Sequence, residues 1–291
     1  MSRATRRFTS ASPEALFVVS GIFQYTGASV AIHLFHELPP ATVAMFRVLF
    51  GALPVLALSW RAQRKWTRSD LVAAAVFGIA TALMNVCFYL GIARLPLGKS
   101  VMIEFIGPIA LAAYHTRNRR NAAALALAVA GVVILGGVEI GGNFVGVLYI
   151  LGASAMWATY LVLGRRVAHL DRGLSGLGVG LVIGGFAVLP FGYHHALDVL
   201  TSGRLLALCA LVGVFSSSIG YGIDQVVMQR IPMRRVALLL ALLPVTAMVM
   251  GFIALGQVPT FADYLGAALV IAGVLTQERD ELPAPADALS G

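Results

Sequence analysis

Arg47, Glu104 and Asp224 are ionisable residues inside long apolar stretches of the chain. A charge in the apolar interior of a membrane is costly, so such residues mark ion or substrate pathways, or pairs that neutralise each other. His33 is a weaker candidate, because it lies near the end of its stretch, where an imidazole can reach water. Charge neutralisation and proton transfer are therefore the chemistry that these residues suggest.

Arg47 and Glu104 lie at equal depth in their stretches. Each is six positions beyond the start, near Ala41 and Gly98 respectively, which is roughly 9 Å along a helix. Because a buried guanidinium needs a counter-charge, the sequence predicts an ion pair between Arg47 and Glu104. Such a pair is either a static structural brace or part of a binding site, and the sequence leaves both open.

Asp224 has no such partner, because the stretch 174–192, which corresponds to the one that holds Arg47, contains no arginine. A carboxylate without a counter-charge in a low-dielectric environment tends to take up a proton. Asp224 is therefore the first candidate for a proton-coupling group, and Glu104 is the second. The alternative is a carboxylate that faces a water-filled vestibule and has no role.

Several polar and aromatic side chains also lie within the apolar stretches. Trp and Tyr near the ends of membrane spans usually anchor the interface, but Trp157 and Tyr160 are interpreted as facing a cavity. The predicted substrate-binding residues are Gln24, Asn85, Tyr89, Glu104, Trp157, Tyr160 and Tyr221.

Ten apolar stretches must position these residues. Hydrophobic residues make up 59% of the chain, charged residues only 12%, and the mean hydropathy is +0.86, whereas a soluble domain carries about 25% charged residues. Each stretch is long enough to cross about 30 Å of hydrocarbon as a helix. We predict an all-α polytopic membrane protein with ten transmembrane helices, at 15–35, 41–60, 70–93, 98–115, 121–138, 144–163, 174–192, 205–229, 233–255 and 259–276.

The chain repeats itself at an offset of 136 residues. The offset relates three pairs of prolines, Pro54 and Pro190, Pro96 and Pro232, and Pro108 and Pro244. Each half holds five stretches, and an odd number gives the second half the opposite orientation in the membrane. Inverted repeats of this kind are typical of secondary transporters.

The repeat divides the chain into two five-helix units, residues 15–138 and 144–276. A cytoplasmic N-terminus, residues 1–14, precedes them. The acidic, alanine- and proline-containing tail, residues 277–291, is expected to be cytoplasmic and disordered.

Pro108 and Pro244 lie in the middle of their spans at matching places in the two halves. Each removes a hydrogen bond to the carbonyl four residues earlier, in Glu104 and Leu240. Interrupted helices at corresponding places in two repeats indicate a binding site. The alternative is a packing kink.

The distribution of basic residues predicts the orientation. Counted by alternate loops, seventeen of the 21 Lys and Arg residues fall on one side, while Arg94, Lys99 and Arg204 fall on the other and Arg47 lies within a span. Short loops rich in Lys and Arg stay in the cytoplasm. Both termini are therefore predicted to be cytoplasmic, as ten spans require. The net charge of +8 follows the membrane topology, so we expect no nucleic-acid partner.

The sequence contains few signs of an enzyme active site. The sequence has no H-E-x-x-H, G-x-S-x-G or Walker A motif and no paired carboxylates within one loop, so we expect no catalytic residues, no cofactor and no metal. Cys87 and Cys209 lie inside apolar stretches, as packing residues do. The expected partners are a small-molecule substrate, the lipid bilayer and protons.

Spans 3 and 4 carry a pattern that points to one family. The motifs Asn85-x-x-Phe88-Tyr89-Leu90, Pro96-Leu97-Gly98 and Val101-x-x-Glu104-Phe105-x-Gly107-Pro108 resemble those of bacterial threonine/homoserine exporters, in the EamA branch of the drug/metabolite transporter superfamily. Arg47, Trp157 with Tyr160, and Tyr221-x-x-Asp224 fit the same pattern. The resemblance covers about residues 14–276.

This resemblance implies ten helices and proton-coupled export of small amino acids or related metabolites across the bacterial inner membrane. The chain departs from the family at four positions. Leu243 and Gln257 stand where glutamate is common, Asp224 replaces what is often Glu, and Lys99 occupies a usually apolar position. Because position 243 lacks the carboxylate that is common in the family, the resemblance does not determine which substrate is exported.

We therefore expect a secondary-active exporter of a small polar metabolite, such as threonine or homoserine, that acts as a monomer or homodimer. A drug or nucleoside exporter of the same superfamily is one alternative, which a mostly aromatic cavity would favour. The other alternative is a non-transporting membrane scaffold or sensor subunit, in which polar residues would not converge near the midplane.

Reporter fusions test the predicted topology. Fusions after residues 61–68 and 117–120 should report a cytoplasmic location, because these loops are rich in arginine and lysine. Fusions near His36 and Gly141 should report an external location. A cytoplasmic reporter at Gly141 would contradict the inverted arrangement of the two halves.

Overall fold

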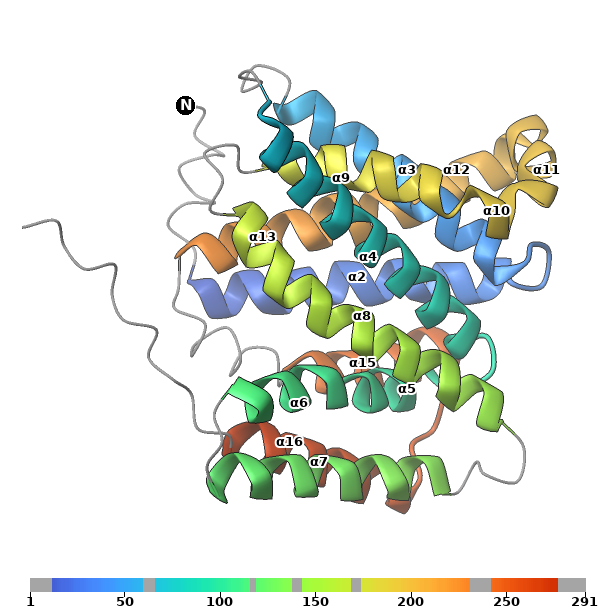
Figure 1. Cartoon of the computed structure of the whole chain (residues 1–291). Coiled ribbons are helices and arrows are strands. Elements are labelled where there is room, and N and C mark those ends of the chain that lie inside the picture. The colour runs from blue at the N-terminus through green and yellow to red at the C-terminus, as the bar shows by residue number, and fades with distance from the viewer. Residues whose placement is uncertain are drawn as a thin grey trace, which may run out of the picture.

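The structure is a computed structural model that describes residues 12–59, 66–115, 119–137, 143–168, 174–230 and 242–276, and these residues are mainly helical (Figure 1). This confirms the predicted all-α class. The helical segments are α2 (Pro13–Leu34), α3 (Pro40–Ser59), α4 (Arg68–Ile92), α5 (Leu97–Glu104), α6 (Ile106–His115), α7 (Arg119–Gly137), α8 (Phe144–Ala168), α9 (Leu174–Ala187), α10 (Leu189–Gly192), η2 (Tyr193–His195), α11 (Ala196–Thr201), α12 (Gly203–Val212), the π-helical η3 (Gly213–Gly220), α13 (Tyr221–Arg230), α15 (Leu242–Leu255) and α16 (Phe261–Thr276).

Five continuous helical stretches of the described residues are long and apolar enough to cross a membrane: Ala15–Leu34, Pro40–Ser59, Arg68–Ile92, Phe144–Gly164 and Gly203–Met228. A sixth candidate is the pair Leu174–Ala187 and Leu189–Thr201, which is bent by 57°. The other predicted spans correspond to shorter apolar helices or to the broken pair α5 and α6. The chain is thus a multi-pass membrane protein, while the count of ten spans stays a prediction.

Helix starts follow from local capping. Ser12 accepts a hydrogen bond from the backbone of Ala15 at the start of α2. Thr67 and Asp70 form a reciprocal capping box at the start of α4. Such caps satisfy N–H groups that have no partner within the helix, and both lie directly before an apolar stretch.

The predicted break in the fourth span is present. The helix is interrupted at Phe105, between α5 and α6, three residues before Pro108. The carbonyl oxygen of Glu104, which Pro108 deprives of its helical donor, accepts a hydrogen bond from Ser154 Oγ at 2.7 Å. A neighbouring helix thus satisfies the exposed backbone group, as a membrane interior requires. The corresponding carbonyl of Leu240, upstream of Pro244, lies outside the described residues.

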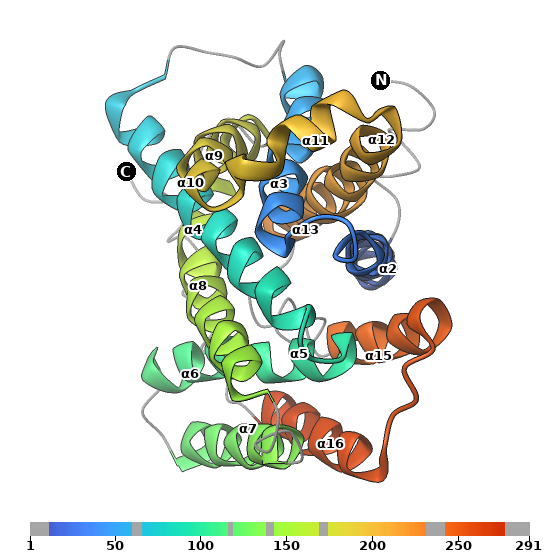
Figure 2. The same cartoon turned by 90° about the vertical axis from the view of Figure 1, so that its right-hand side faces the viewer.

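Helices from the two halves of the chain pack against each other throughout the bundle. α4 lies against α8 and α9, while the segments η3 and α13 lie against α2 and α3. Close approach is possible at glycines, since a Cβ on Gly78 would lie 1.8 Å from the carbonyl oxygen of Gly180. α7 and α16 pair at one side of the bundle, next to α5, α6 and α15 (Figures 1 and 2).

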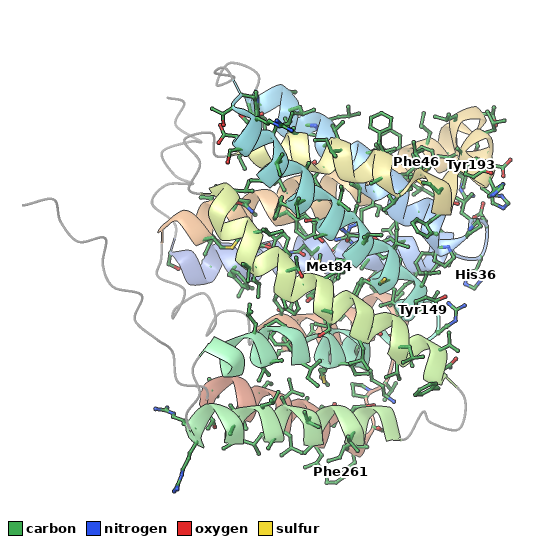
Figure 3. All side chains as sticks on the ribbon, in the orientation of Figure 1. His36, Phe46, Met84, Tyr149, Tyr193 and Phe261 are labelled. Atoms are coloured by element: carbon green, nitrogen blue, oxygen red, sulfur yellow. The ribbon has the colours of Figure 1, made fainter. Side chains whose placement is uncertain are left out.

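Polar contacts join the two halves at one end of the bundle, the end where Figure 3 shows His36, Tyr149 and Tyr193. Arg204 contacts Glu37 at 2.7 Å, and its hydrogen bonds lower the pKa of the exposed Glu37 carboxyl. Gln257 Oε1 accepts from the backbone N–H of Leu97 at 3.0 Å.

The charge count grouped Lys99 with the loop residues on one side of the membrane, although it falls at the start of the predicted span 98–115. It lies buried in α5, and its Nζ is 3.2 Å from Asp263 Oδ1 on α16. A buried ammonium requires such a partner, so Lys99 belongs to the contacts between halves and not to the solvent-exposed charges.

Ser154→Ala tests the repair of the broken helix. Removing the donor leaves the buried Glu104 carbonyl without its side-chain partner, which should cost about 1–3 kcal/mol. The measurement is the melting temperature of the purified protein in detergent.

The matched background is Pro108→Ala, which restores a backbone N–H for the same carbonyl. In that background Ser154→Ala should cost clearly less. An equal loss in both backgrounds would mean that Ser154 acts through packing and not through the carbonyl of Glu104.

Candidate functional site

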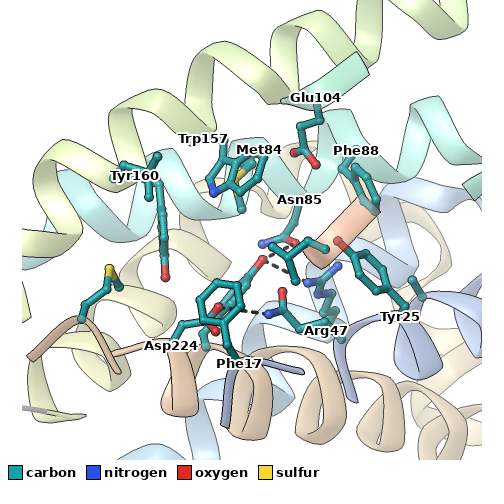
Figure 4. Close-up of a pocket in the computed structure, with 16 residues that line it drawn as sticks. Phe17, Tyr25, Arg47, Met84, Asn85, Phe88, Glu104, Trp157, Tyr160 and Asp224 are labelled. Atoms are coloured by element: carbon teal, nitrogen blue, oxygen red, sulfur yellow. Dashed lines mark hydrogen bonds between the residues drawn. The ribbon is translucent and has the colours of Figure 1, made fainter. Parts of the chain in front are cut away.

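A cavity of about 70 Å³ lies among helices of both halves (Figure 4). Its walls come from α2, α3, α4, α5, α8, α13 and α15. The lining residues are Phe17, Gln24, Tyr25, Ala28, Arg47, Met84, Asn85, Phe88, Glu104, Trp157, Tyr160, Leu161, Tyr221, Asp224, Met228 and Leu243.

The structure brings almost all sequence-predicted site residues to this cavity. The charged candidates Arg47, Glu104 and Asp224 line it, as do Gln24, Asn85, Trp157, Tyr160 and Tyr221. Tyr89 does not line the cavity. It is fully buried behind Arg47, with its ring 5.5 Å from that of Phe35. His33 is exposed and contacts the carbonyl of Ser29 at 2.9 Å, away from the cavity.

Arg47 is held by neutral partners. Its Nη2 donates to the hydroxyl of Tyr221 at 3.0 Å, and its Nε donates to Ser217 Oγ at 3.4 Å. The guanidinium also lies over two aromatic rings, 5.1 Å from the centroid of Tyr89 and 5.5 Å from that of Tyr221. Hydrogen bonds and cation–π contacts can both stabilise a buried cation.

The predicted ion pair between Arg47 and Glu104 is wrong as a direct contact. Among the described residues, the ion pairs within 4.0 Å do not include one between these two side chains. Equal depth along two helices brings both residues to the same cavity, but it does not bring their side chains together. The guanidinium instead donates hydrogen bonds to Tyr221 at the start of α13 and to Ser217 in η3.

Glu104 presents its carboxylate to the cavity (Figure 4). It lies at the last residue of α5, where the break before Pro108 ends the helix. The hydrogen bonds of the described residues include its backbone carbonyl but not its carboxylate. The carboxylate oxygens are thus available as acceptors for a group inside the cavity.

Asp224 has hydrogen-bond partners that the sequence analysis did not foresee. Ser20 Oγ donates to its Oδ1 at 2.6 Å, and Gln24 Nε2 donates to its Oδ2 at 3.0 Å. Both donors are neutral and lie one turn apart on α2. Asp224 thus lacks a cationic partner within ion-pair distance among the described residues, but its carboxylate accepts hydrogen bonds.

A hydrogen-bonded chain crosses the cavity wall near the centre of the molecule. The Tyr221 hydroxyl accepts from Arg47 and donates to Asn85 Oδ1 at 3.1 Å, and Asn85 Nδ2 donates to the carbonyl of Thr81 at 2.8 Å. Asn85 and Tyr221 are 136 residues apart, the same offset that relates the prolines of the two halves. Direct contact between residues at this offset is what a two-fold axis between the halves would produce.

Aromatic rings form a large part of the remaining wall. Trp157 packs edge-on against Phe105 at 4.9 Å between ring centroids. Tyr160 lies 5.1 Å from Phe77 and 5.8 Å from Tyr221. The cavity therefore combines the side chains of Arg47, Glu104 and Asp224 with broad aromatic surfaces. Among the described residues, His, Cys, Asp and Glu do not gather in groups of three or more that could hold a metal ion.

Sequence reasoning missed the serines that serve these charges. Ser20 and Ser217 contact Asp224 and Arg47, while Ser216 and Ser218 donate to the carbonyls of Gln24 and Gly51. Three of these serines lie in the π-helical η3. The sequence signal that could have identified these serines was the run of three between Gly213 and Gly220 inside an apolar span. Polar residues are costly in a membrane interior and usually mark a functional or structural contact.

Comparison with known proteins confirms the resemblance inferred from the sequence. The model of the EamA-like transporter family matches residues 144–276. The threonine/homoserine exporter RhtA of Salmonella typhimurium (strain SL1344) is 29% identical over 277 residues, which cover 94% of this chain and 93% of that protein. RhtA of Escherichia coli (strain K12) is 29% identical over 251 residues, covering 84% of each chain.

A solved crystal structure shares the fold. It matches with a TM-score of 0.61 over 92% of this chain and 96% of that chain, at 18% identity, so the likeness concerns architecture alone. Together with the apolar helices, the relatives support a membrane exporter and are consistent with the absence of an enzymatic role.

Tyr221→Phe tests the network that holds Arg47. The change removes one acceptor of the guanidinium and the donor to Asn85, and a hydrogen bond to a charged group contributes about 1.5–3 kcal/mol. We expect a clear loss of melting temperature in detergent.

The control is Tyr149→Phe on the same scaffold. Tyr149 contacts Arg94 through its ring, at 5.2 Å, and does not line the cavity, so its variant should melt like the unmodified protein. Equal melting temperatures for the two variants would show that the hydroxyl of Tyr221 does not support Arg47.

Proposed function

We propose that this EamA-like protein is a secondary-active, proton-coupled exporter of small zwitterionic metabolites, amino acids such as threonine or homoserine first among them. The observation that carries the proposal is the pair of opposite charges on the cavity wall. Arg47 is held by neutral groups, and the carboxylate of Glu104 faces the cavity. A zwitterion offers a carboxylate to the first and an ammonium to the second.

In this proposal the polar, charged and aromatic residues predicted for the site have separate roles. Arg47 would bind the substrate carboxylate through its guanidinium fork, and Glu104 would bind the ammonium. Gln24, Asn85, Trp157, Tyr160 and Tyr221 would shape the cavity around the substrate, with Tyr89 behind Arg47. Asp224 would carry the coupling proton, because its neutral donors leave it free to exist with or without one.

The proposed topology has ten spans in two inverted repeats, residues 15–138 and 144–276, with both termini in the cytoplasm of a bacterial cell and the protein in its inner membrane. The offset of 136 residues, the arginine-rich loops and the contact between Asn85 and Tyr221 support it. The inner-membrane location also accords with the exporters that the chain resembles. The unit of transport would be a monomer or a homodimer.

A drug or nucleoside exporter is the second candidate. Aromatic residues supply a large part of the cavity wall, among them Phe17, Tyr25, Phe88, Trp157 and Tyr160, and leucine replaces the family's usual carboxylate at Leu243. Flat, apolar ligands would use these surfaces. A scaffold or sensor role is disfavoured, because polar side chains converge on one cavity.

Competition for transport separates the two candidates. In liposomes that contain the purified protein, threonine should compete with labelled threonine, whereas its analogue without the carboxylate and its analogue without the amino group should compete poorly. Each analogue leaves one cavity charge without its partner, which costs about 1–3 kcal/mol. Better competition by a nucleoside or an aromatic cation would favour the second candidate.

Asp224→Asn tests proton coupling. An amide cannot exchange a proton, so accumulation driven by a pH gradient should be lost, while exchange of labelled for unlabelled threonine at equal pH should continue. Asp198→Asn, a change at an exposed carboxylate, is the control and should leave both intact. If the Asp224→Asn protein still accumulates threonine when driven by a pH gradient, Asp224 is not the proton-coupling group, and Glu104 becomes the next candidate.

A further inference from the structure

Ser20 lies at the centre of the contacts around Asp224. Its side chain is fully buried on α2. Its hydroxyl oxygen is 2.6 Å from Asp224 Oδ1, 3.0 Å from the carbonyl oxygen of Gly220 and 2.9 Å from Gln24 Nε2. All three distances are suitable for hydrogen bonds.

One hydrogen must serve two acceptors at this position. A serine hydroxyl has a single hydrogen and two lone pairs. Asp224 Oδ1 and the carbonyl of Gly220 therefore compete for the hydrogen of Ser20. Gln24 has two N–H groups and can donate to Ser20 Oγ and to Asp224 Oδ2 at the same time.

We propose that Ser20 is a positioning residue that transmits the protonation state of Asp224 to the backbone of the helical segment formed by η3 and α13. This inference rests on the proposed role of Asp224 as the coupling carboxyl. When Asp224 is ionised, the Ser20 hydroxyl donates to Oδ1. When Oδ1 binds a proton, its new O–H donates to Ser20 Oγ across the same separation, and the Ser20 hydrogen turns to the carbonyl of Gly220.

Hydrogen bonds are satisfied in both states. In the ionised state Ser20 accepts from Gln24 and donates to Asp224. In the protonated state it accepts from Gln24 and from Asp224, which uses both lone pairs, and donates to Gly220. The only covalent change is the bond between the proton and Oδ1, and a rotation of the hydroxyl group is enough to exchange the partners.

The receiving carbonyl lies at a special place in the helix. Gly220 is the last residue of η3, the π-helical turn, and Asp224 follows one turn later in α13. π-helical turns occur often at functional sites. A Cβ on Gly220 would lie 2.3 Å from Gln24 Cγ, so the absence of a side chain lets α2 approach closely enough for Ser20 to reach the carbonyl.

Other titratable groups face the same cavity. These are Tyr25 from α2, Arg47 from α3, Glu104 from α5, Tyr160 from α8 and Tyr221 from α13. They can add to the field at Asp224, but among the described residues its carboxylate hydrogen bonds come from Ser20 and Gln24. The direct coupling to the carboxylate therefore passes through α2.

Ser20→Ala is the test, with Ser216→Ala as a matched control. Ser216 is also fully buried and also joins η3 to α2, through the carbonyl of Gln24 at 3.1 Å. Among the described residues, the hydrogen bonds to the Asp224 carboxylate come from Ser20 and Gln24 and not from Ser216. The measurement is threonine exchange in liposomes at equal internal and external pH, recorded over a range of pH. Melting temperatures establish that the variants are folded.

We expect Ser20→Ala to raise the midpoint of the pH profile by about half to one pH unit, since a hydrogen bond to an ionised acceptor is about twice as strong as a neutral one. Ser216→Ala should leave the midpoint unchanged. Ser20→Cys, which keeps a weaker donor of similar shape, should give a smaller shift and replaces Ser20→Ala if the alanine variant does not fold.

Two results would overturn the inference. One is an unchanged midpoint in a folded Ser20→Ala protein while Asp224→Asn loses its pH dependence. The other is an equal shift in Ser216→Ala, which would assign the effect to helix packing. A pH profile that survives Asp224→Asn would instead contradict the proposed role of Asp224 itself.

Discussion

A charge inside an apolar helical bundle must be surrounded by groups that replace water, and much of the cavity follows from this requirement. Arg47 meets it without a carboxylate at ion-pair distance in the part of the chain that the structure describes, through the hydroxyls of Tyr221 and Ser217 and the rings of two tyrosines. Asp224 meets it through two neutral donors on α2. Because neither side chain has an oppositely charged partner within ion-pair distance among the described residues, both remain able to respond to a substrate or a proton.

Irregular helices supply much of this polar environment. The break between α5 and α6 places Glu104 at a helix end, and Ser154 satisfies the carbonyl that Pro108 leaves without a donor. The π-helical η3 carries the serines that contact Arg47 and the backbones of α2 and α3. Two departures from regular α-helix thus lie beside the charged groups of the cavity, which is where a membrane protein tolerates them.

The sequence was sufficient for the helical class and for most of the residues that share the cavity. Apolar length and prolines report on single helices. The positions of Gln24 and Asn85 within apolar spans, and the family motif that contains Tyr221, were enough to predict that these residues share one cavity. Side-chain partners were harder, because equal depth says nothing about the rotation of a helix about its axis. For that reason the sequence analysis predicted an ion pair between Arg47 and Glu104, whereas the structure shows hydrogen bonds from Arg47 to Tyr221 and Ser217.

Two residues that depart from the family pattern, Lys99 and Gln257, make contacts at one end of the bundle. Lys99 pairs with Asp263, and Gln257, in the segment between α15 and α16, accepts a hydrogen bond from the backbone at the start of α5. Both contacts therefore join different halves of the chain. The sequence did not predict these contacts, because each depends on a residue about 160 positions away. Leu243, in contrast, lines the cavity itself and makes it less acidic than the family pattern implies.

The central claim is that Asp224 carries the coupling proton and releases it when the substrate binds in the same cavity. Addition of threonine to the purified protein in weakly buffered solution measures this directly. If Asp224 releases its proton when the zwitterion binds, the solution should acidify in proportion to the bound threonine, and the Asp224→Asn protein should bind threonine without acidification. Binding without proton release in the unmodified protein, or equal release in the Asp224→Asn protein, would contradict the claim.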